Sequence, residues 1–108
     1  MTKLVNYTED QIQRGYILRC KWDYPYEGVV DLLVCDSFLP ERSGCRLVVA
    51  SGYKAGLTNC VLPEESLPEG FASGLKTDWL FNNFTEWFPI PIADVWVVPD
   101  CVPEMPCD

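Results

Sequence analysis

Histidine is absent from this sequence, and its absence excludes much catalytic chemistry. None of the 108 residues is histidine, so the chain lacks the side chain that most often acts as a general base near neutral pH. Cys/His zinc sites and imidazole-dependent triads are excluded for the same reason. Much enzyme chemistry is therefore excluded, and we expect no metal or other cofactor.

Long apolar runs are also missing. The apolar residues 32–35 stand between Asp31 and Asp36, and no run approaches the roughly 18 residues that a membrane span needs. The first ten residues contain no apolar signal region and already include Glu9 and Asp10. These absences predict a soluble, cytoplasmic protein.

The six cysteines never show the C-x-x-C spacing that is typical of redox and zinc motifs. Cys101 and Cys107 flank a proline-rich tail. The sequence leaves open whether these two cysteines form a disulfide in an oxidising environment. The other four lie in apolar, β-prone segments, where a free thiol behaves as a small hydrophobic side chain. We expect reduced, mostly buried thiols, as in the cytoplasm, at Cys20, Cys35, Cys45 and Cys60.

Basic residues are scarce in the second half of the chain. Residues 1–60 contain as many bases as acids, whereas residues 61–108 contain nine acids and a single base, Lys76, which accounts for the whole net charge of −8. Such a negative field repels nucleic acid and anionic membranes and attracts a basic protein. The alternative is that the charge serves solubility alone.

Residues 16–62 are predicted to form a β-meander. Apolar and alternating segments are separated there by turns and by a loop at residues 22–28, all rich in Pro and Gly. The predicted strands cover residues 16–20, 29–36, 45–51 and 57–62. Before them, Thr8 is placed to cap a short helical turn over residues 9–14. Asp31 lies inside a predicted strand, and the sequence does not decide between a solvated and a hydrogen-bonded carboxylate.

One helix is predicted in the C-terminal half, after a polar surface connection over residues 63–74. Thr77 is placed to cap a helix over residues 78–88, and Pro89 ends it. An apolar stripe at helical spacing is expected to face the core and consists of Leu80, Phe81, Phe84, Trp87 and Phe88.

The order of elements predicts an α+β fold in one small domain spanning residues 1–108. A mainly antiparallel meander sheet is packed by the single helix, and a final strand at residues 93–98 follows the helix. Residues 99–108 form a tail that contains Pro and Cys.

Loop carboxylates are the remaining candidates for catalysis. Glu64 with Glu65, or Asp23 with Glu27, could supply an acid and a base. Solvated loop acids are far commoner, so a small hydrolase is only a minor alternative. The sequence has no calcium-loop pattern, and residues 52–56 lack the spacing of a phosphate-binding loop.

Aromatic side chains beside acids indicate two candidate protein-binding patches, because Tyr and Trp are favoured as interface anchors. The alternative for Trp22, Tyr24 and Trp79 is that they cover the edges of the sheet. The first candidate patch consists of Glu64, Glu65, Glu69, Asp78, Trp79, Glu86 and Asp94. The second consists of Asp23, Tyr24, Tyr26 and Glu27.

Several short segments occur in a characteristic order along the chain. They are residues 53–56 (YKAG), 61–64 (VLPE), 77–80 (TDWL) with Trp87, and 93–97 (ADVWV), preceded by residues 4–7 (LVNY), 15–20 (GYILRC) and 23–26 (DYPY). Over residues 4–98, this pattern resembles bacterial polymorphic-toxin immunity proteins of family 45. The segments are turn and core signatures, so the resemblance concerns the fold more than a shared binding surface.

The resemblance implies a cytoplasmic antitoxin encoded beside a toxin of the contact-dependent inhibition type. Such a protein binds the toxin's C-terminal domain and protects the producing cell and its siblings, and no catalytic residues are expected. Together with the negative charge, this favours a basic toxin, such as a nuclease, as the partner. A cytoplasmic adaptor is the main alternative, and the oligomeric state stays open.

Overall fold

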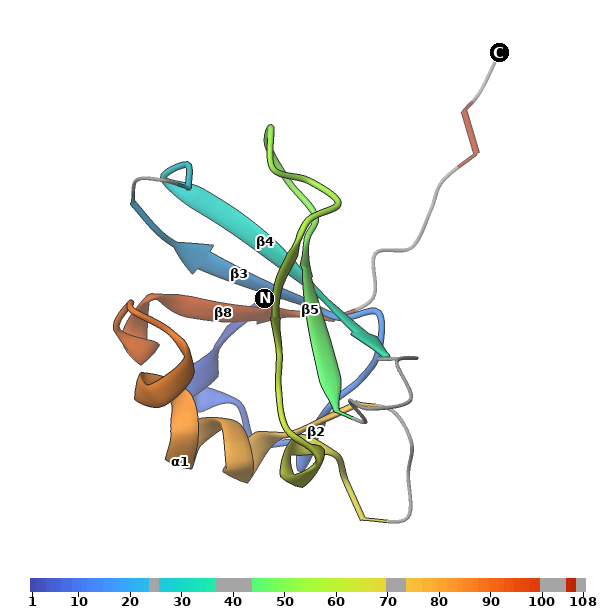
Figure 1. The fold of residues 1–108 in the computed structure, drawn as a ribbon, viewed down its shortest axis with the longest axis vertical. Coiled ribbons are helices and arrows are strands. Elements are labelled where there is room, and N and C mark those ends of the chain that lie inside the picture. The colour runs from blue at the N-terminus through green and yellow to red at the C-terminus, as the bar shows by residue number, and fades with distance from the viewer. Residues whose placement is uncertain (24–25, 37–43, 70–73, 100–104, 107–108) are drawn as a thin grey trace.

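The computed structural model describes residues 1–23, 26–36, 44–69, 74–99 and 105–106 (Figure 1). The strands of its main sheet are β1 (Thr2–Lys3), β3 (Ile17–Lys21), β4 (Val29–Asp36), β5 (Cys45–Val49), β6 (Thr58–Val61) and β8 (Val95–Val98). They form a six-stranded antiparallel sheet in the order β1-β8-β3-β4-β5-β6. The predicted α+β fold, with its meander and a final strand after the helix, is confirmed.

The meander β3-β4-β5-β6 buries one face of the sheet. Its side chains alternate between the two faces, as the pleat requires, and Leu18, Leu32 and Val49 lie side by side in register on the buried face. The predicted loop after β3 is confirmed where the structure describes it, and the Trp22 N–H donates to the Gly28 carbonyl at 3.0 Å.

The final strand lies inside the sheet rather than at its edge. β8 pairs with β3 on one side and with β1 on the other. Val95 and Val97 are both completely buried. The sequence predicted this strand but neither its neighbours nor β1, which has only two residues.

The expected helical turn after Thr8 does not form. A 3-10 turn, η1, covers Leu4–Asn6 instead, and Gln11–Ile12 forms strand β2, which pairs antiparallel with β7 (Leu75–Lys76). Ile12 and Leu75 are completely buried in this small sheet. A helix of six residues is marginal by itself, so burial of Ile12 against a distant segment decides the local conformation.

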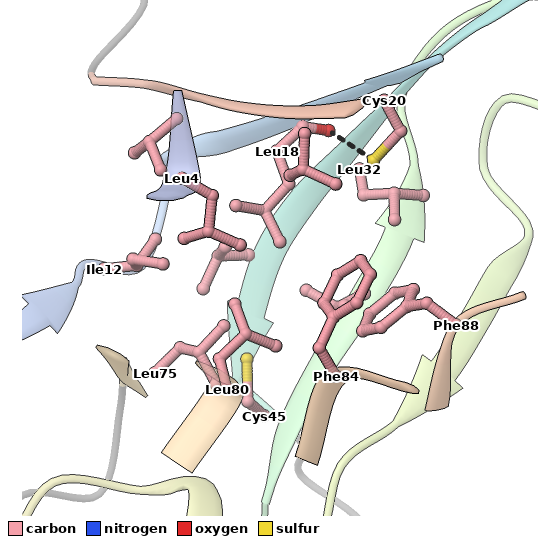
Figure 2. Packing of buried hydrophobic residues seen from close by; sticks show 14 of the residues in the cluster. Leu4, Ile12, Leu18, Cys20, Leu32, Cys45, Leu75, Leu80, Phe84 and Phe88 are labelled. Atoms are coloured by element: carbon pink, nitrogen blue, oxygen red, sulfur yellow. Dashed lines mark hydrogen bonds between the residues drawn. The ribbon is translucent and has the colours of Figure 1, made fainter. Parts of the chain in front are cut away.

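Helix α1 (Thr77–Trp87) lies across the buried face of the main sheet (Figure 1). Leu80, Phe84 and Phe88 are buried as predicted, and Figure 2 shows the two phenylalanines pointing toward the sheet residues Leu18 and Leu32. The helix and β8 are joined by the 3-10 turn η3 (Ile92–Asp94).

Two details of the predicted helix are wrong. Trp87 is 37% exposed, because Phe88, the first residue beyond the helix, stacks on Phe84 with ring centroids 4.6 Å apart and takes the buried place. Thr77 does not cap the helix, because the helix begins at Thr77 itself and its Oγ1 is buried without a hydrogen-bond partner. Lys76 occupies the capping position without a side-chain hydrogen bond.

The cysteines in the described part of the chain are free thiols. Cys20 and Cys45 are buried as expected, whereas Cys35 and Cys60 are only partly buried. Cys101 and Cys107 lie outside the described residues, so a disulfide between them stays an alternative that the sequence alone raises. In the parts of the chain that the structure describes, no helix is long and apolar enough to cross a membrane.

The two buried thiols predict a loss of stability at high pH. Burial is the main cause that raises the pKa of Cys20 and of Cys45 from 9.0 to about 12. Between these values the unfolded chain releases protons that the folded chain keeps, so the free energy of unfolding falls as the pH rises, by at most about 1.4 kcal/mol per pH unit and thiol. Urea unfolding at about pH 8 and about pH 10.5 measures this slope. Cys20→Ala should make the slope shallower than in the parent, and an equal slope would contradict the assignment.

Candidate functional site

Two adjoining depressions meet at strand β2 of the small β2–β7 sheet. The first has a volume of about 470 Å³ and the second of about 370 Å³, and both are lined by Asp10 and Gln11. Glu9 lines the first depression, whereas Glu69 and Asp78 line the second. We call Glu9, Asp10, Glu69 and Asp78 the acidic rim.

The β2–β7 pairing holds the acidic rim in place. Gln11 lies opposite Lys76 in register, and the Thr77 N–H donates to the Asp10 carbonyl at 3.0 Å. The Tyr7 hydroxyl donates to the Gln11 carbonyl at 2.7 Å. These bonds tie the N-terminal segment to the start of α1, which carries Asp78 in its first turn.

The acidic rim is a negative, solvent-accessible surface. All four carboxylates belong to exposed residues, and Lys76 is the one base among the described residues that line the depressions. Burial, the neighbouring Tyr16 and the negative charge of Glu9 together raise the pKa of Tyr7. The Tyr7 hydroxyl therefore stays protonated and keeps its donated hydrogen bond up to higher pH than an ordinary phenol.

The other residues of the first predicted patch are dispersed. Glu64 and Glu65 are exposed on the 3-10 turn η2 (Glu64–Ser66), which contacts α1. Glu86 is exposed in the last turn of α1, and Asp94 is partly buried in η3. Neither residue lines the two depressions.

Trp79 is partly buried rather than projecting as a free anchor. Its ring packs against the hydrophobic core and lies 6.3 Å from the ring of Trp87. Its carbonyl accepts a hydrogen bond from Asn83 Nδ2 at 2.8 Å. Trp79 thus has a packing role, whereas the sequence left open whether it anchors a partner or covers an edge of the sheet.

The second predicted patch joins two loops at one end of the sheet. Glu27 Oε1 accepts a hydrogen bond from the Tyr53 N–H at 3.1 Å, and the Tyr26 hydroxyl accepts one from Asn59 Nδ2 at 3.1 Å. The Lys54 ammonium lies 5.5 Å from the ring centroids of both Tyr26 and Tyr53. Through this hydrogen bond Glu27 holds the loop of residues 50–57 in place, and it also adds a negative charge to the second patch.

The remaining residues of that patch differ in their surroundings. Asp23 is exposed, Tyr24 lies outside the described residues, and Tyr53, which the sequence interpretation missed, is 73% exposed. A signal for Tyr53 was present, because its segment YKAG belongs to the family-like pattern.

Metal binding has no support in the described residues, where no group of three or more Asp, Glu or Cys side chains is placed to hold an ion.

A family model described as immunity protein 45 matches residues 4–102. The chain belongs to the immunity protein 45 family. No curated protein and no solved structure matches this immunity protein. Membership implies that it neutralises a cognate toxin by binding it, and immunity proteins are generally not enzymes. The resemblance seen in the sequence is thereby confirmed.

Proposed function

We propose that this immunity protein neutralises a basic toxin domain, specifically a nuclease, through its acidic rim together with Glu64 and Glu65. The observation that supports the proposal is the meeting of four exposed carboxylates around two open depressions that contain one base. The protein acts in the cytoplasm of the producing cell and its siblings, which exchange the toxin by contact-dependent delivery.

A nuclease provides the complementary surface for these carboxylates. Enzymes that bind nucleic acid neutralise phosphates with Lys and Arg side chains, so an acidic inhibitor competes with the substrate or excludes it by covering the groove. Each exposed ion pair contributes only about 0–1 kcal/mol. The acidic rim therefore acts mainly on the association rate and on orientation.

The loop end of the sheet is the second proposed contact. Tyr26 is held by Trp22, whose ring centroid lies 4.9 Å away, and by Asn59, so it is presented rigidly beside exposed Asp23. A rigid aromatic side chain loses little conformational entropy on binding. Tyr24, from the same predicted patch, is part of this proposal on sequence grounds alone.

Charge reversal at the acidic rim tests the proposal. Glu69→Lys and Asp78→Lys should each lower the association rate about 3- to 10-fold at low salt and flatten its salt dependence. Glu86→Lys is the matched control, because it changes the net charge equally but lies outside the depressions. The rates are measured by stopped-flow fluorescence against a catalytically inactive C-terminal domain of the toxin encoded beside this gene. Equal effects of all three variants would show that the net charge, and not the acidic rim, guides the toxin.

A further inference from the structure

The face of the main sheet that points away from α1 carries an apolar row. In the paired strands β8, β3, β4 and β5, Val98 lies opposite Ile17, Ile17 opposite Leu33, and Leu33 opposite Val48. All four side chains are partly exposed. The solvated face of an antiparallel sheet is commonly polar, so this row is unusual. We call this side of the sheet the open face.

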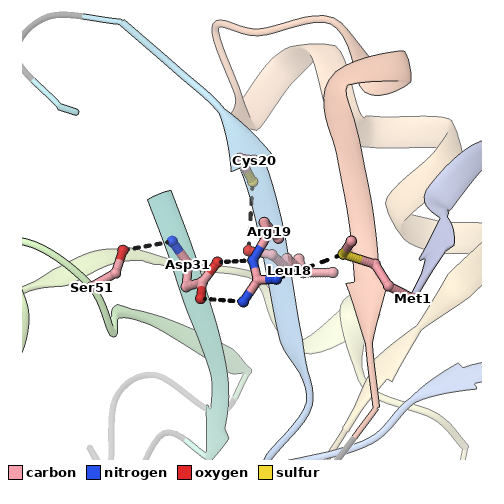
Figure 3. A network of polar contacts seen from close by, with 6 residues as sticks. All are labelled: Met1, Leu18, Arg19, Cys20, Asp31 and Ser51. Carbon is pink, nitrogen blue, oxygen red and sulfur yellow. Dashed lines mark hydrogen bonds and ion pairs between the residues drawn. The ribbon is translucent and has the colours of Figure 1, made fainter. Parts of the chain in front are cut away.

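A second row on the open face combines a tryptophan with paired charges. Trp96 lies opposite Arg19, and Arg19 opposite Asp31. Figure 3 shows the two hydrogen bonds between the guanidinium and the carboxylate, from Nε to Oδ1 at 2.8 Å and from Nη2 to Oδ2 at 3.0 Å. The Asp31 carboxylate is thus already paired with the Arg19 guanidinium of the same chain.

The other charged strand residues on the open face are basic. The ammonium groups of Lys3 and Lys21 lie 5.6 and 5.3 Å from the centroid of the Trp96 ring. Arg46 shares the face, because it lies opposite Cys35 and beside Val48. The described strand residues therefore give the open face the opposite sign to the acidic rim, and they fit an acidic surface with apolar side chains. A second copy packed symmetrically face to face would bring these cations toward one another.

The first depression lies at the end of the sheet where the apolar row begins. Tyr16 and Pro99 line that depression. They are the chain neighbours of Ile17 and Val98, with which the apolar row begins. One partner can therefore cover both the acidic rim and the open face.

We infer that the open face is a contact surface for the same toxin domain, which meets Trp96 and the apolar row with apolar side chains and meets Lys3 and Lys21 with carboxylates. This inference rests on the proposed function, since it assigns a second surface to the same partner. The acidic rim speeds the encounter, whereas burial of the open face slows dissociation, because tightly bound interfaces depend on buried aromatic anchors. The two surfaces of opposite sign also fix the orientation of the toxin.

A matched pair of tryptophan variants tests the inference. Trp96→Ala should accelerate dissociation of the inactive toxin domain about 30-fold or more, whereas Trp87→Ala, on the helix, should change it by less than about 3-fold. Dissociation is followed by surface plasmon resonance, and thermal unfolding of each variant checks its fold.

A charge variant keeps the test independent of the packing of Trp96. Lys21 is exposed, so Lys21→Glu should leave the fold intact and weaken binding about 5-fold or more, whereas Lys21→Arg should retain it. If the wild-type chain binds no toxin domain, the proposed function itself fails. If it binds and neither Trp96→Ala nor Lys21→Glu weakens the complex, the inference fails while the proposed function stands. A dimer in sedimentation that Trp96→Ala dissociates, or RNA binding that Lys21→Glu abolishes, with toxin binding unchanged, would assign the open face to another occupant.

Discussion

Replacing Phe84 by alanine is expected to lower the free energy of unfolding by about 3–5 kcal/mol. Phe84 is 2% exposed and is among the largest fully enclosed side chains of the core. Its ring stacks on Phe88 and faces the buried side of the sheet (Figure 2). Removing it leaves a cavity between the helix and the sheet, so the loss includes both transfer and packing energy. Urea unfolding followed by far-UV circular dichroism measures the change.

Thr85→Ala provides the control for this variant. Thr85 is the next residue of the same helix and is exposed, and alanine has a higher helix propensity than threonine. Its free energy of unfolding should therefore stay within about 0.5 kcal/mol of the parent. Similar stabilities of Phe84→Ala and Thr85→Ala would show that Phe84 does not fill the core.

Gly44→Ala is expected to destabilise the protein by about 3 kcal/mol, at the upper end of typical overpacking costs. A Cβ atom at Gly44 would overlap the backbone carbonyl oxygen of Leu62. That segment of backbone is held in place, because the Leu62 N–H donates to the Cys45 carbonyl at 2.7 Å. The start of β5 and the end of β6 must therefore separate to admit the methyl group. The measurement is again urea unfolding, with hydrogen exchange at the Leu62 amide as a local probe.

Gly28→Ala is the matched control for the backbone contact. Gly28 lies in a loop, and a Cβ atom there would meet no atom within 4 Å. Its stability should equal or slightly exceed that of the parent, because alanine restricts the unfolded chain more than glycine does. If both glycine variants were equally stable, the close approach of Gly44 to Leu62 would be contradicted.

Local patterns were sufficient to predict the larger elements. The apolar runs that form β4 and β5 are bounded by turn residues, and Leu80 and Phe84 recur at helical spacing, so burial and periodicity agree there. Strands β1, β2 and β7 have two residues each. A segment of two residues is too short to show the alternation of apolar and polar side chains that predicts a strand. Its pairing depends on contacts with residues far away in the chain. The helical turn expected after Thr8 failed for the same reason.

The candidate site was only partly predictable. Glu69 and Asp78 followed from the excess of acids in the second half of the chain. Glu9 and Asp10 belong to the half that is neutral by count, and the pairing of β2 with β7 brings Asp10 beside Asp78. Asp31 stayed undecided in the sequence because its partner, Arg19, is contributed by the neighbouring strand.

The position of β8 determines when the main sheet can close during synthesis. β3 forms hydrogen bonds with β4 on one side and with β8 on the other, and within the described part of the chain β1 joins the sheet through β8 alone. While the ribosome is still making residues 95–98, β3 lacks one neighbour and β1 has none. The native sheet thus closes only after residues 95–98 have left the exit tunnel. The earlier strands alone therefore leave β3 with a single neighbour, and the complete six-stranded sheet forms once β8 is free to pair on both of its sides.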